Sequence, residues 1–575
     1  MATGTSVALA LVGGAYAQVA VLLALATGTL LALWQAHAAT AQAQVARAAQ
    51  ARAEGVKQFI ASIFTEAKPR DGSGGVVTAL ALLESATQRI ESELAANAAM
   101  AGELGVLVGD GCSRLGDLTL GLQALDAAVP RCRQALGDAH TVTLRGRVLQ
   151  LEAANGNSQF DRVRALSPRL LDELRAQLPA QAELLVMALD CAAFARAKLN
   201  DVDGSLAPLR EAVSLAETHL GPLHEQTVQI LGSLSNTCVR FGLLAEALRV
   251  AEDALQRTRK SVGDMRPHTR LTHQERWYAD ALVNNGRPAD AEPIARQVVI
   301  DQRALDGELD RRVINAMTSH SMALAGMGRT EEAVAMARKV VSWYVTRSPG
   351  ADDDALAYAY RLAFCLLPTR RVDDIQAALD RVDSLYRALG VVRTLHEVRH
   401  QRMGAQVLAW RGDGAAARAV LDGLEDSSRG AHALEWTRIA RVRAMAWRLQ
   451  GDTAAGLAAA QEAIDRATAT QAPAVDRAHA HTELGLLLQD SGDIPAATEQ
   501  LEQALALYTL AQVRPSVLNA DALLGLGRLH LLAGRRAQAL ASFSQVQALW
   551  GASHPGSGWQ LQAQRLAAQA KALDA

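Results

Sequence analysis

Six arginines in two neighbouring segments of the chain could together bind acidic groups. They are Arg399, Arg402, Arg438, Arg441 and Arg448, with Arg443 close by. A guanidinium group donates paired hydrogen bonds to a carboxylate, so this cluster could hold acidic side chains or the C-terminal carboxylate of a peptide. The other interpretation is that arginine is simply the usual solvent-exposed residue of a chain that contains only six lysines.

The sequence contains no recognisable catalytic motif. There is no GxSxG, no HExxH, no Walker loop and no paired cluster of cysteine and histidine. His396 and His400 are four residues apart and could share a helix face and bind a metal, but we favour a solvated helix face. Cys112 and Cys238 occupy equivalent repeat positions, which indicates small core residues. We therefore expect no catalysis, no metal and no cofactor.

The composition predicts a helical protein. The chain has 575 residues, of which 50% are hydrophobic but only 4% are aromatic, so its apolar content is mostly alanine, leucine and valine. The net charge of −2 gives no overall attraction for nucleic acid. Five cysteines without a CxxC pattern exclude a disulfide scaffold and a structural zinc module.

The first segment, residues 1–37, is predicted to be a transmembrane anchor. No charged side chain occurs before Arg47, and residues 7–34 form an apolar run longer than the ~20 residues that span a bilayer. A buried helix is one alternative. The other is a signal peptide cleaved after Ala38, although the run is long for one and no basic residue precedes it.

The next segments connect this anchor to the rest of the chain. Residues 38–68 predict a helical juxtamembrane segment, residues 69–77 a glycine-rich linker and residues 78–100 a further helix. Arg47, Arg52 and Lys57 follow the apolar run, so the positive-inside rule places the C-terminal part in the cytoplasm.

From about residue 101 to residue 550 the sequence repeats itself, with a period of about 42 residues. Each unit has one helix, a short polar turn and a second helix that opens with small residues. The predicted turn residues are 116, 158, 200, 242, 286, 328, 370, 412, 451, 492 and 534. Five residues after the turn a small residue recurs, as at Ala247 and Ala333, which lets the two helices press together. A capping helix is expected over residues 551–575.

This pattern resembles the tetratricopeptide repeat. The best matches are Leu526-Gly527, Ala539, Phe543 and Val546, and Leu484-Gly485, Ala497, Leu501 and Ala504. The 42-residue period is similar to the longer repeats of kinesin light chain, and the final proline of the family pattern is mostly missing. The units at 158 and 370 are degenerate. The resemblance implies an all-α solenoid of about eleven helix pairs.

The same resemblance suggests where the arginines lie. In this repeat class the first helix of each pair lines a concave groove, which would hold Arg399, Arg402, Arg438, Arg441 and Arg448. We predict that Arg402 and Arg441 face this groove within reach of one ligand. A structure that places both on the convex side would contradict this.

The N-terminal quarter has a second resemblance. The segments that carry it are 33–36, 54–60, 63–69, 80–86 and 89–91. They are similar to the half of bacterial membrane-anchored serine/threonine kinases that follows the kinase domain, which would place the repeats in the periplasm, against the charge rule. This chain has no His-Arg-Asp and no Asp-Phe-Gly, so the resemblance gives no ground for kinase activity.

These observations predict a membrane-tethered scaffold or sensor, without catalysis, in the bacterial inner membrane. Its partner would be a protein or peptide bound along the concave face, with acidic groups to match the arginines, and not nucleic acid. Two alternatives stay open: the sensor half of a truncated or split receptor kinase, and a cleaved periplasmic binding protein. The sequence leaves open the identity of the ligand, the side of the membrane and the oligomeric state.

Overall fold

The structure is a computed structural model of the whole chain. It describes residues 78–308, 310–347, 353–389, 395–425, 433–513, 518–553 and 558–572, together with 54–63 and a few positions between 34 and 50. Every regular element in these ranges is a helix, as the composition predicts. The predicted linker, residues 69–77, lies outside the described residues.

The chain divides into two compact units, residues 1–153 and 154–575. The first contains a helical segment over residues 54–63 and the helices α2 (Ala79–Glu93), α3 (Ala98–Arg114) and α4 (Leu118–Leu136), while α5 (Thr141–Gly156) crosses the division. Phe59, Ile90, Leu104 and Cys112 belong to its core. Residues 54–63 therefore pack with the first repeat helices of this unit.

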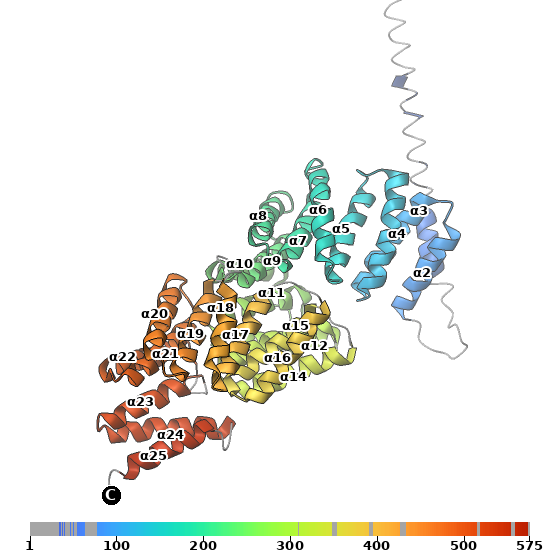
Figure 1. The fold of residues 1–575 in the computed structure, drawn as a ribbon. Coiled ribbons are helices and arrows are strands. Elements are labelled where there is room, and N and C mark those ends of the chain that lie inside the picture. Colours follow the sequence, from blue (N-terminus) through green and yellow to red (C-terminus); the bar gives the residue numbers. More distant parts are fainter. Residues whose placement is uncertain are drawn as a thin grey trace, which may run out of the picture. The chain divides into compact units, whose positions relative to one another are not determined.

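The second unit continues as a series of helix pairs (Figure 1). Its helices are α6 (Phe160–Arg175), α7 (Ala182–Lys198), α8 (Val202–His219), α9 (Glu225–Arg240), α10 (Leu244–Val262), α11 (Thr269–Asn284), α12 (Pro288–Asp306), α13 (Arg311–Gly326), α14 (Thr330–Arg347), α15 (Asp353–Leu366), η1 (Leu367–Thr369), α16 (Val372–Leu389), α17 (Leu395–Trp410), α18 (Gly414–Glu425), α19 (Ala433–Leu449), α20 (Thr453–Ala469), α21 (Ala474–Ser491), α22 (Ile494–Leu510), α23 (Ala520–Leu532), α24 (Arg536–Ser553) and α25 (Gly558–Ala572).

The predicted turn residues all end a helix in the left-handed conformation. Their φ angles run from 53° at Arg370 to 95° at Gly116. Glycine adopts this conformation without steric cost, which is why it occupies most of these positions. Ser158 and Arg370 adopt it in the two units that looked degenerate, so these units keep the same turn.

The small residues of the repeat lie where the two helices of a pair cross. Ala247, Ala333 and Ala539 are completely buried five residues after their turns. A Cβ atom added to Gly527 of α23 would lie 2.5 Å from the ring of Phe543 in α24. The aromatic ring therefore fills the space that the glycine leaves, which explains this part of the tetratricopeptide pattern.

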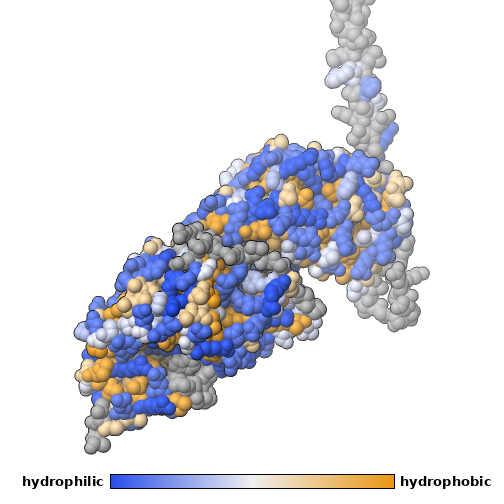
Figure 2. Space-filling model, viewed as in Figure 1, coloured by the Kyte–Doolittle hydropathy of each residue, from blue (hydrophilic) through white to orange (hydrophobic). Residues whose placement is uncertain are grey.

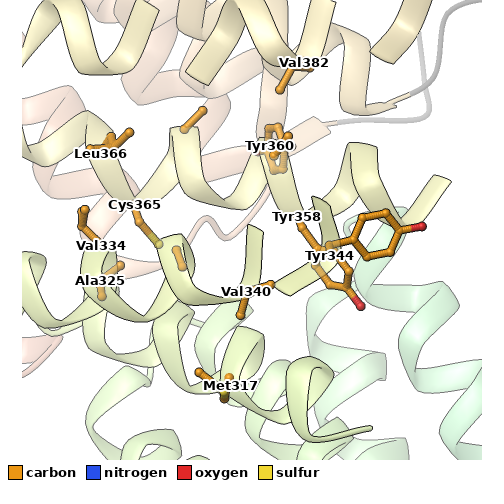
Figure 3. Close-up of a cluster of buried hydrophobic side chains, with 14 of the residues drawn as sticks. Met317, Ala325, Val334, Val340, Tyr344, Tyr358, Tyr360, Cys365, Leu366 and Val382 are labelled. Atoms are coloured by element: carbon orange, nitrogen blue, oxygen red, sulfur yellow. The ribbon is translucent and has the colours of Figure 1, made fainter. Parts of the chain in front are cut away.

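The hydrophobic core runs continuously from one pair to the next. The cluster of Figure 3 contains Met317 of α13, Val334 and Val340 of α14, Tyr358 and Cys365 of α15 and further side chains of α16. No single pair encloses these side chains, so each pair depends on its neighbours for burial.

The first helices of successive pairs lie against one another. Contacts join α7 to α9, α9 to α11 and each later odd-numbered helix to the next, as far as α25. We call the side of the second unit that these helices line the inner face. This is the arrangement that the resemblance to tetratricopeptide repeats implied.

Pairs far apart in the sequence also meet within the second unit. Arg370, at the turn between α15 and α16, forms an ion pair with Asp521 of α23. A Cβ atom added to Gly286, between α11 and α12, would lie 2.8 Å from the Cβ atom of Pro473, which precedes α21. Helix pairs that are four to five units apart in the sequence are therefore in contact within the second unit.

The predicted membrane span cannot be described from the structure. Residues 7–33 lie outside the described residues, and Trp34 is helical and exposed. Among the helices that are described, none combines the length and apolarity that crossing a bilayer requires. Hydrophilic residues cover most of the face seen in Figure 2, with apolar residues in small patches between them.

Two of the expected segments each contain parts of two helices. The helix expected over residues 78–100 is α2, with α3 beginning at Ala98. The C-terminal segment 551–575 contains the end of α24 and then α25 (Gly558–Ala572).

Candidate functional site

The five predicted arginines lie on α17 and α19, neighbouring helices of the inner face. Their bonding partners are side chains of α17, α19 and α21, which the pairing of the first helices brings together. The partners are Glu435, Asp476, Glu483 and Gln406. We call these nine residues the arginine network.

Glu435 is the centre of the arginine network. Its Oε1 accepts hydrogen bonds from Nε of Arg399 at 3.0 Å and from Nη1 of Arg438 at 2.7 Å. Its Oε2 accepts one from Nε of Arg402 at 3.1 Å. The side chains of Glu435 and Arg402 are each only 3% exposed. Burial favours the protonated carboxyl, but the three arginines hold the pKa of Glu435 well below its ordinary value.

Two further carboxylates continue the arginine network along α21. Asp476 accepts a bidentate pair of hydrogen bonds from Arg438, at 2.7 and 3.0 Å. Glu483 accepts one from Nε of Arg448 at 3.1 Å. Burial would raise the pKa of Asp476, but Arg438 lowers it below its ordinary value. Asp476 therefore carries a charge at neutral pH, and the two carboxylates hold Arg438 and Arg448 by these hydrogen bonds.

Arg441 differs from the other four arginines because its bonding partner is neutral. Its Nη2 donates to Oε1 of Gln406 at 3.4 Å, and its Nε is buried without a hydrogen bond within the described part of the chain. Burial and the charge of Arg402 lower the pKa of Arg441, while Glu483 opposes this. Arg402 and Arg441 thus lie near each other on the inner face. Whether they reach one ligand stays a prediction.

Arg443 lies outside the arginine network. It points toward the second helices, where it forms ion pairs with Asp422 of α18 at 3.4 Å and Glu462 of α20 at 4.0 Å. Sequence proximity therefore grouped it with arginines that face the other way.

Two further arginines lie on helices of the inner face and were not predicted from the sequence. Arg276 of α11 stands ten residues before its turn residue, as Arg402 and Arg441 do, so the repeat register could have revealed it. Burial and the charge of Arg361, on α15, both lower the pKa of Arg276. Arg361 gave no signal of this kind. The inner face thus holds a second pair of neighbouring cations.

The favoured interpretation of the histidine pair was wrong for His400, and the side chain of His396 lies outside the described residues. His400 is not on a solvated face but is 6% exposed, and its Nε2 lies 2.7 Å from Oδ1 of Asp383 in α16. Asp383 lies on the neighbouring pair, so the sequence spacing could not indicate it. No group of metal-binding side chains occurs in the described ranges.

The interpretation of the cysteines is confirmed. Cys112 and Cys238 are completely buried. Burial raises the pKa of the Cys112 thiol to about 11 and that of Cys238 to about 12, so both stay protonated at neutral pH.

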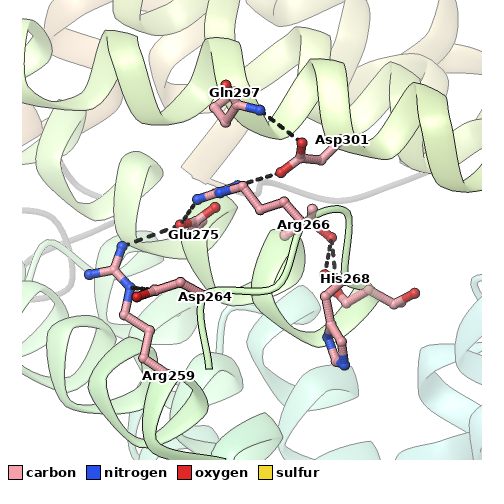
Figure 4. A network of polar contacts seen from close by, with 9 residues as sticks. Arg259, Asp264, Arg266, His268, Glu275, Gln297 and Asp301 are labelled. Carbon is pink, nitrogen blue, oxygen red and sulfur yellow. Dashed lines mark hydrogen bonds and ion pairs between the residues drawn. The ribbon is translucent and has the colours of Figure 1, made fainter. Parts of the chain in front are cut away.

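A second polar cluster, drawn in Figure 4, has a structural role. Arg266, in the loop before α11, forms ion pairs with Glu275 of α11 and Asp301 of α12. Arg259 also lies 3.3 Å from Glu275, and Gln297 donates to Asp301 at 2.8 Å. Both carboxylates are buried and already bonded, so this cluster anchors the loop and offers no open site.

Comparisons with known proteins add only similarities of fold. No known family and no curated protein matches the chain. The structure of Rap protein complexed with competence and sporulation factor is similar over 72% of this chain and 99% of that one, at 12% identity and a TM-score of 0.44. The structure of BtubC from P. vanneervenii is similar over 41% of this chain and 94% of that one, at 18% identity and a TM-score of 0.32.

A third similar structure is a putative kinesin light chain of Podosopora anserina with nearly identical TPR-like repeats. It covers 35% of this chain and 94% of that one, at 18% identity and a TM-score of 0.28. Because all three TM-scores are below 0.5, the all-α array of TPR-like helix pairs rests on the helices of this chain itself. None of the three is a membrane-anchored kinase, so that resemblance stays an expectation.

Proposed function

We propose that this protein is a non-catalytic repeat scaffold that binds an acidic protein segment or peptide on its inner face. The observation that supports this most is the gathering of Arg399, Arg402, Arg438, Arg441 and Arg448 on two adjacent inner helices. The ligand would contact the partly exposed arginines of this group together with Arg276 and Arg361, over several helix pairs, while the buried Arg402 would hold Glu435 in place. Affinity would come from many modest contacts.

The carboxylates of the arginine network would prepare this surface for binding. Glu435 and Asp476 hold the guanidinium groups of Arg399 and Arg438 by one or two bonds each. Arginine loses conformational freedom when it binds, so side chains already held in place bind at a smaller entropic cost. Arg441, which is bonded only to an amide, is the arginine that we expect to gain most from a ligand carboxylate.

A binding experiment on Arg441 tests this function. The probe is a fluorescent decapeptide of alternating glutamate and alanine, titrated with the full chain and followed by fluorescence anisotropy. We expect Arg441→Gln to weaken binding by about tenfold or more, because a hydrogen bond to a charged group is worth ~1.5–3 kcal/mol. Added salt should weaken binding by the wild-type protein.

Arg443→Gln is the matched control, since Arg443 is on the same helix but faces Asp422 and Glu462. It should bind the peptide as the wild type does. Equal binding by all three proteins, or binding that is no stronger than that of a glutamine–alanine peptide, would overturn the proposal. Far-ultraviolet circular dichroism checks that both variants are folded.

We further propose that residues 1–37 tether this scaffold to a bacterial inner membrane. The absence of charge before Arg47 supports this. The test is the intact mass of the protein recovered from membranes of its own cells. A chain that begins at Ala39 in the soluble periplasmic fraction would contradict the tether, and a much heavier species would favour the kinase alternative.

A further inference from the structure

A small cavity lies where the turn between α9 and α10 approaches α17 and α19. It measures about 20 Å³, and its charged lining residues are Arg240, Arg399, Glu435 and Arg438. A cavity needs ~10–15 Å³ of this kind to hold one water molecule, so the space is enough for one water molecule or one small monatomic ion.

The charges around the cavity do not balance. Glu435 already accepts from Arg399, Arg402 and Arg438, and Asp476 is bonded to Arg438. Arg240 donates from Nε to the carbonyl oxygen of Ala197 at 2.9 Å and has no acidic partner among the residues that the structure describes. Three arginines and one carboxylate thus line the cavity, and Asp476, which lies outside it, is paired with Arg438 alone among the described residues, so positive charge is left over there.

The charges of Arg240 and Arg399 are close enough to change the pKa of Arg240. Burial and the charge of Arg399 lower the pKa of Arg240 to about 10. Two arginine side chains repel one another unless an anion lies between them. A lining of this kind therefore favours a negative charge inside the cavity.

The start of α10 contributes positive charge to the cavity, opposed by the end of α9, whose Val239 and Arg240 also line it. Gly242 and Leu244 line the cavity, and Leu243, the residue that caps α10, contributes no side-chain hydrogen bond. The first N–H groups of a helix point out of its end and carry a partial positive charge. Anions bind readily at such helix ends when cationic side chains are also present.

We propose that this cavity holds one monovalent inorganic anion of the size of chloride, between Arg240, Arg399, Arg438 and the start of α10. The anion neutralises arginines from helix pairs that lie four to five repeats apart in the sequence. It thereby joins two parts of the stack that the chain connects only through the intervening pairs. Binding adds to the stability of the folded state in proportion to the logarithm of the anion concentration.

Thermal unfolding of the full chain tests this proposal. The unfolding midpoint is measured in sodium chloride and in sodium gluconate of equal concentration, because gluconate is too large for the cavity. We expect the wild type to unfold about 2 °C or more higher in chloride. Arg240→Gln should lose this difference, since it removes the arginine that lacks an acidic partner.

Arg196→Gln is the matched control. Arg196 is also partly buried and also donates to a backbone carbonyl, that of Gly204, but it does not line the cavity. It should keep the chloride effect. An equal response of the wild type and Arg240→Gln, or no difference between the two salts, overturns the proposal.

A crystallographic experiment decides the matter even if Arg240→Gln does not fold. Wild-type crystals grown in sodium bromide should show an anomalous peak between Arg240 and Arg399. A cavity that holds only water, without anomalous signal, overturns the proposal. The two proposals share Arg399 and Arg438, but the peptide test is made at Arg441, which does not line the cavity, so the failure of one proposal can be told from the failure of the other.

Discussion

At the scale of single residues, the arginine network depends on the balance between burial and charge. Moving Glu435 and Arg402 out of water is costly, and the hydrogen bond between them, together with those that Glu435 accepts from Arg399 and Arg438, offsets this cost. Glu435 accepts from three arginines, so removing its charge would leave Arg399, Arg402 and Arg438 without a shared partner. Glu435 therefore holds more of these arginines in place than any other carboxylate of the arginine network does.

We predict that Glu435→Gln lowers the free energy of unfolding by about 3 kcal/mol or more, because it leaves buried arginines unpaired. Urea unfolding followed by circular dichroism measures this. The control is Glu332→Gln, which breaks an exposed pair with Arg329 and should cost about 1 kcal/mol or less. Equal losses in both variants would contradict the central role of Glu435.

The same residue should give the stability a dependence on pH. Because the folded protein holds the pKa of Glu435 below its ordinary value of 4.5, the stabilisation is complete above that value. It is lost as the pH falls toward the folded pKa, since the unfolded state takes up the proton first. Glu435→Gln should therefore lose less stability than the wild type between about pH 4.5 and 2.

At the scale of elements, helix ends and helix crossings determine how the pairs form. Asp117, Asp201, Asp452 and Asp493 each cap a second helix by accepting from a backbone N–H in its first turn, at 2.9 to 3.1 Å. Such a cap is worth about 1 kcal/mol. The helix crossings depend on small residues. At each glycine, the surrounding atoms determine whether an added side chain stabilises or destabilises the fold.

Two helical glycines should respond oppositely to alanine. A Cβ atom at Gly232 of α9 would lie 1.7 Å from the ring of Trp277 in α11, whereas one at Gly404 of α17 meets nothing within 4 Å. We predict that Gly232→Ala costs ~1–3 kcal/mol through overpacking. Gly404→Ala should gain ~0.5–1 kcal/mol through helix propensity. Thermal unfolding of both variants measures these changes in stability. If both variants were stabilised, or both destabilised, the contact with Trp277 would not explain the difference.

At the scale of the whole second unit, contacts between distant pairs keep the stack in one arrangement. The guanidinium of Arg370 lies 5.6 Å from the ring centre of Trp410 and 5.4 Å from that of Trp550, besides its ion pair with Asp521. The positive φ of this turn residue directs the chain into the next helix while its side chain reaches a pair four units away. Nearest-neighbour packing alone would not provide this restraint.

A double-mutant cycle tests this restraint. Arg370→Met and Asp521→Asn should be coupled by ~1–3 kcal/mol, as expected for residues in direct contact. The control cycle uses Arg338 and Asp374, an exposed ion pair at 2.9 Å between adjacent pairs, whose coupling should be about 0–0.5 kcal/mol. Additive effects of Arg370→Met and Asp521→Asn would mean that the distant pairs are not held together here.

The helices, their period and their turns could be predicted because each depends on neighbours in the sequence. A left-handed residue ends a helix wherever it stands, and a small residue such as Ala247 permits a helix crossing a few residues away. The placement of the arginines on inner helices followed from the same register.

Only the tertiary structure decided which groups these arginines meet. Glu435 joins Arg399 and Arg402 across adjacent pairs, His400 meets Asp383, and Arg240 approaches Arg399 after several intervening pairs. These contacts depend on the small rotation between one pair and the next, which accumulates along the stack. No local pattern of residues records that sum, so the approach of Arg370 to Asp521 and the cavity beside Arg240 had no signal in the sequence.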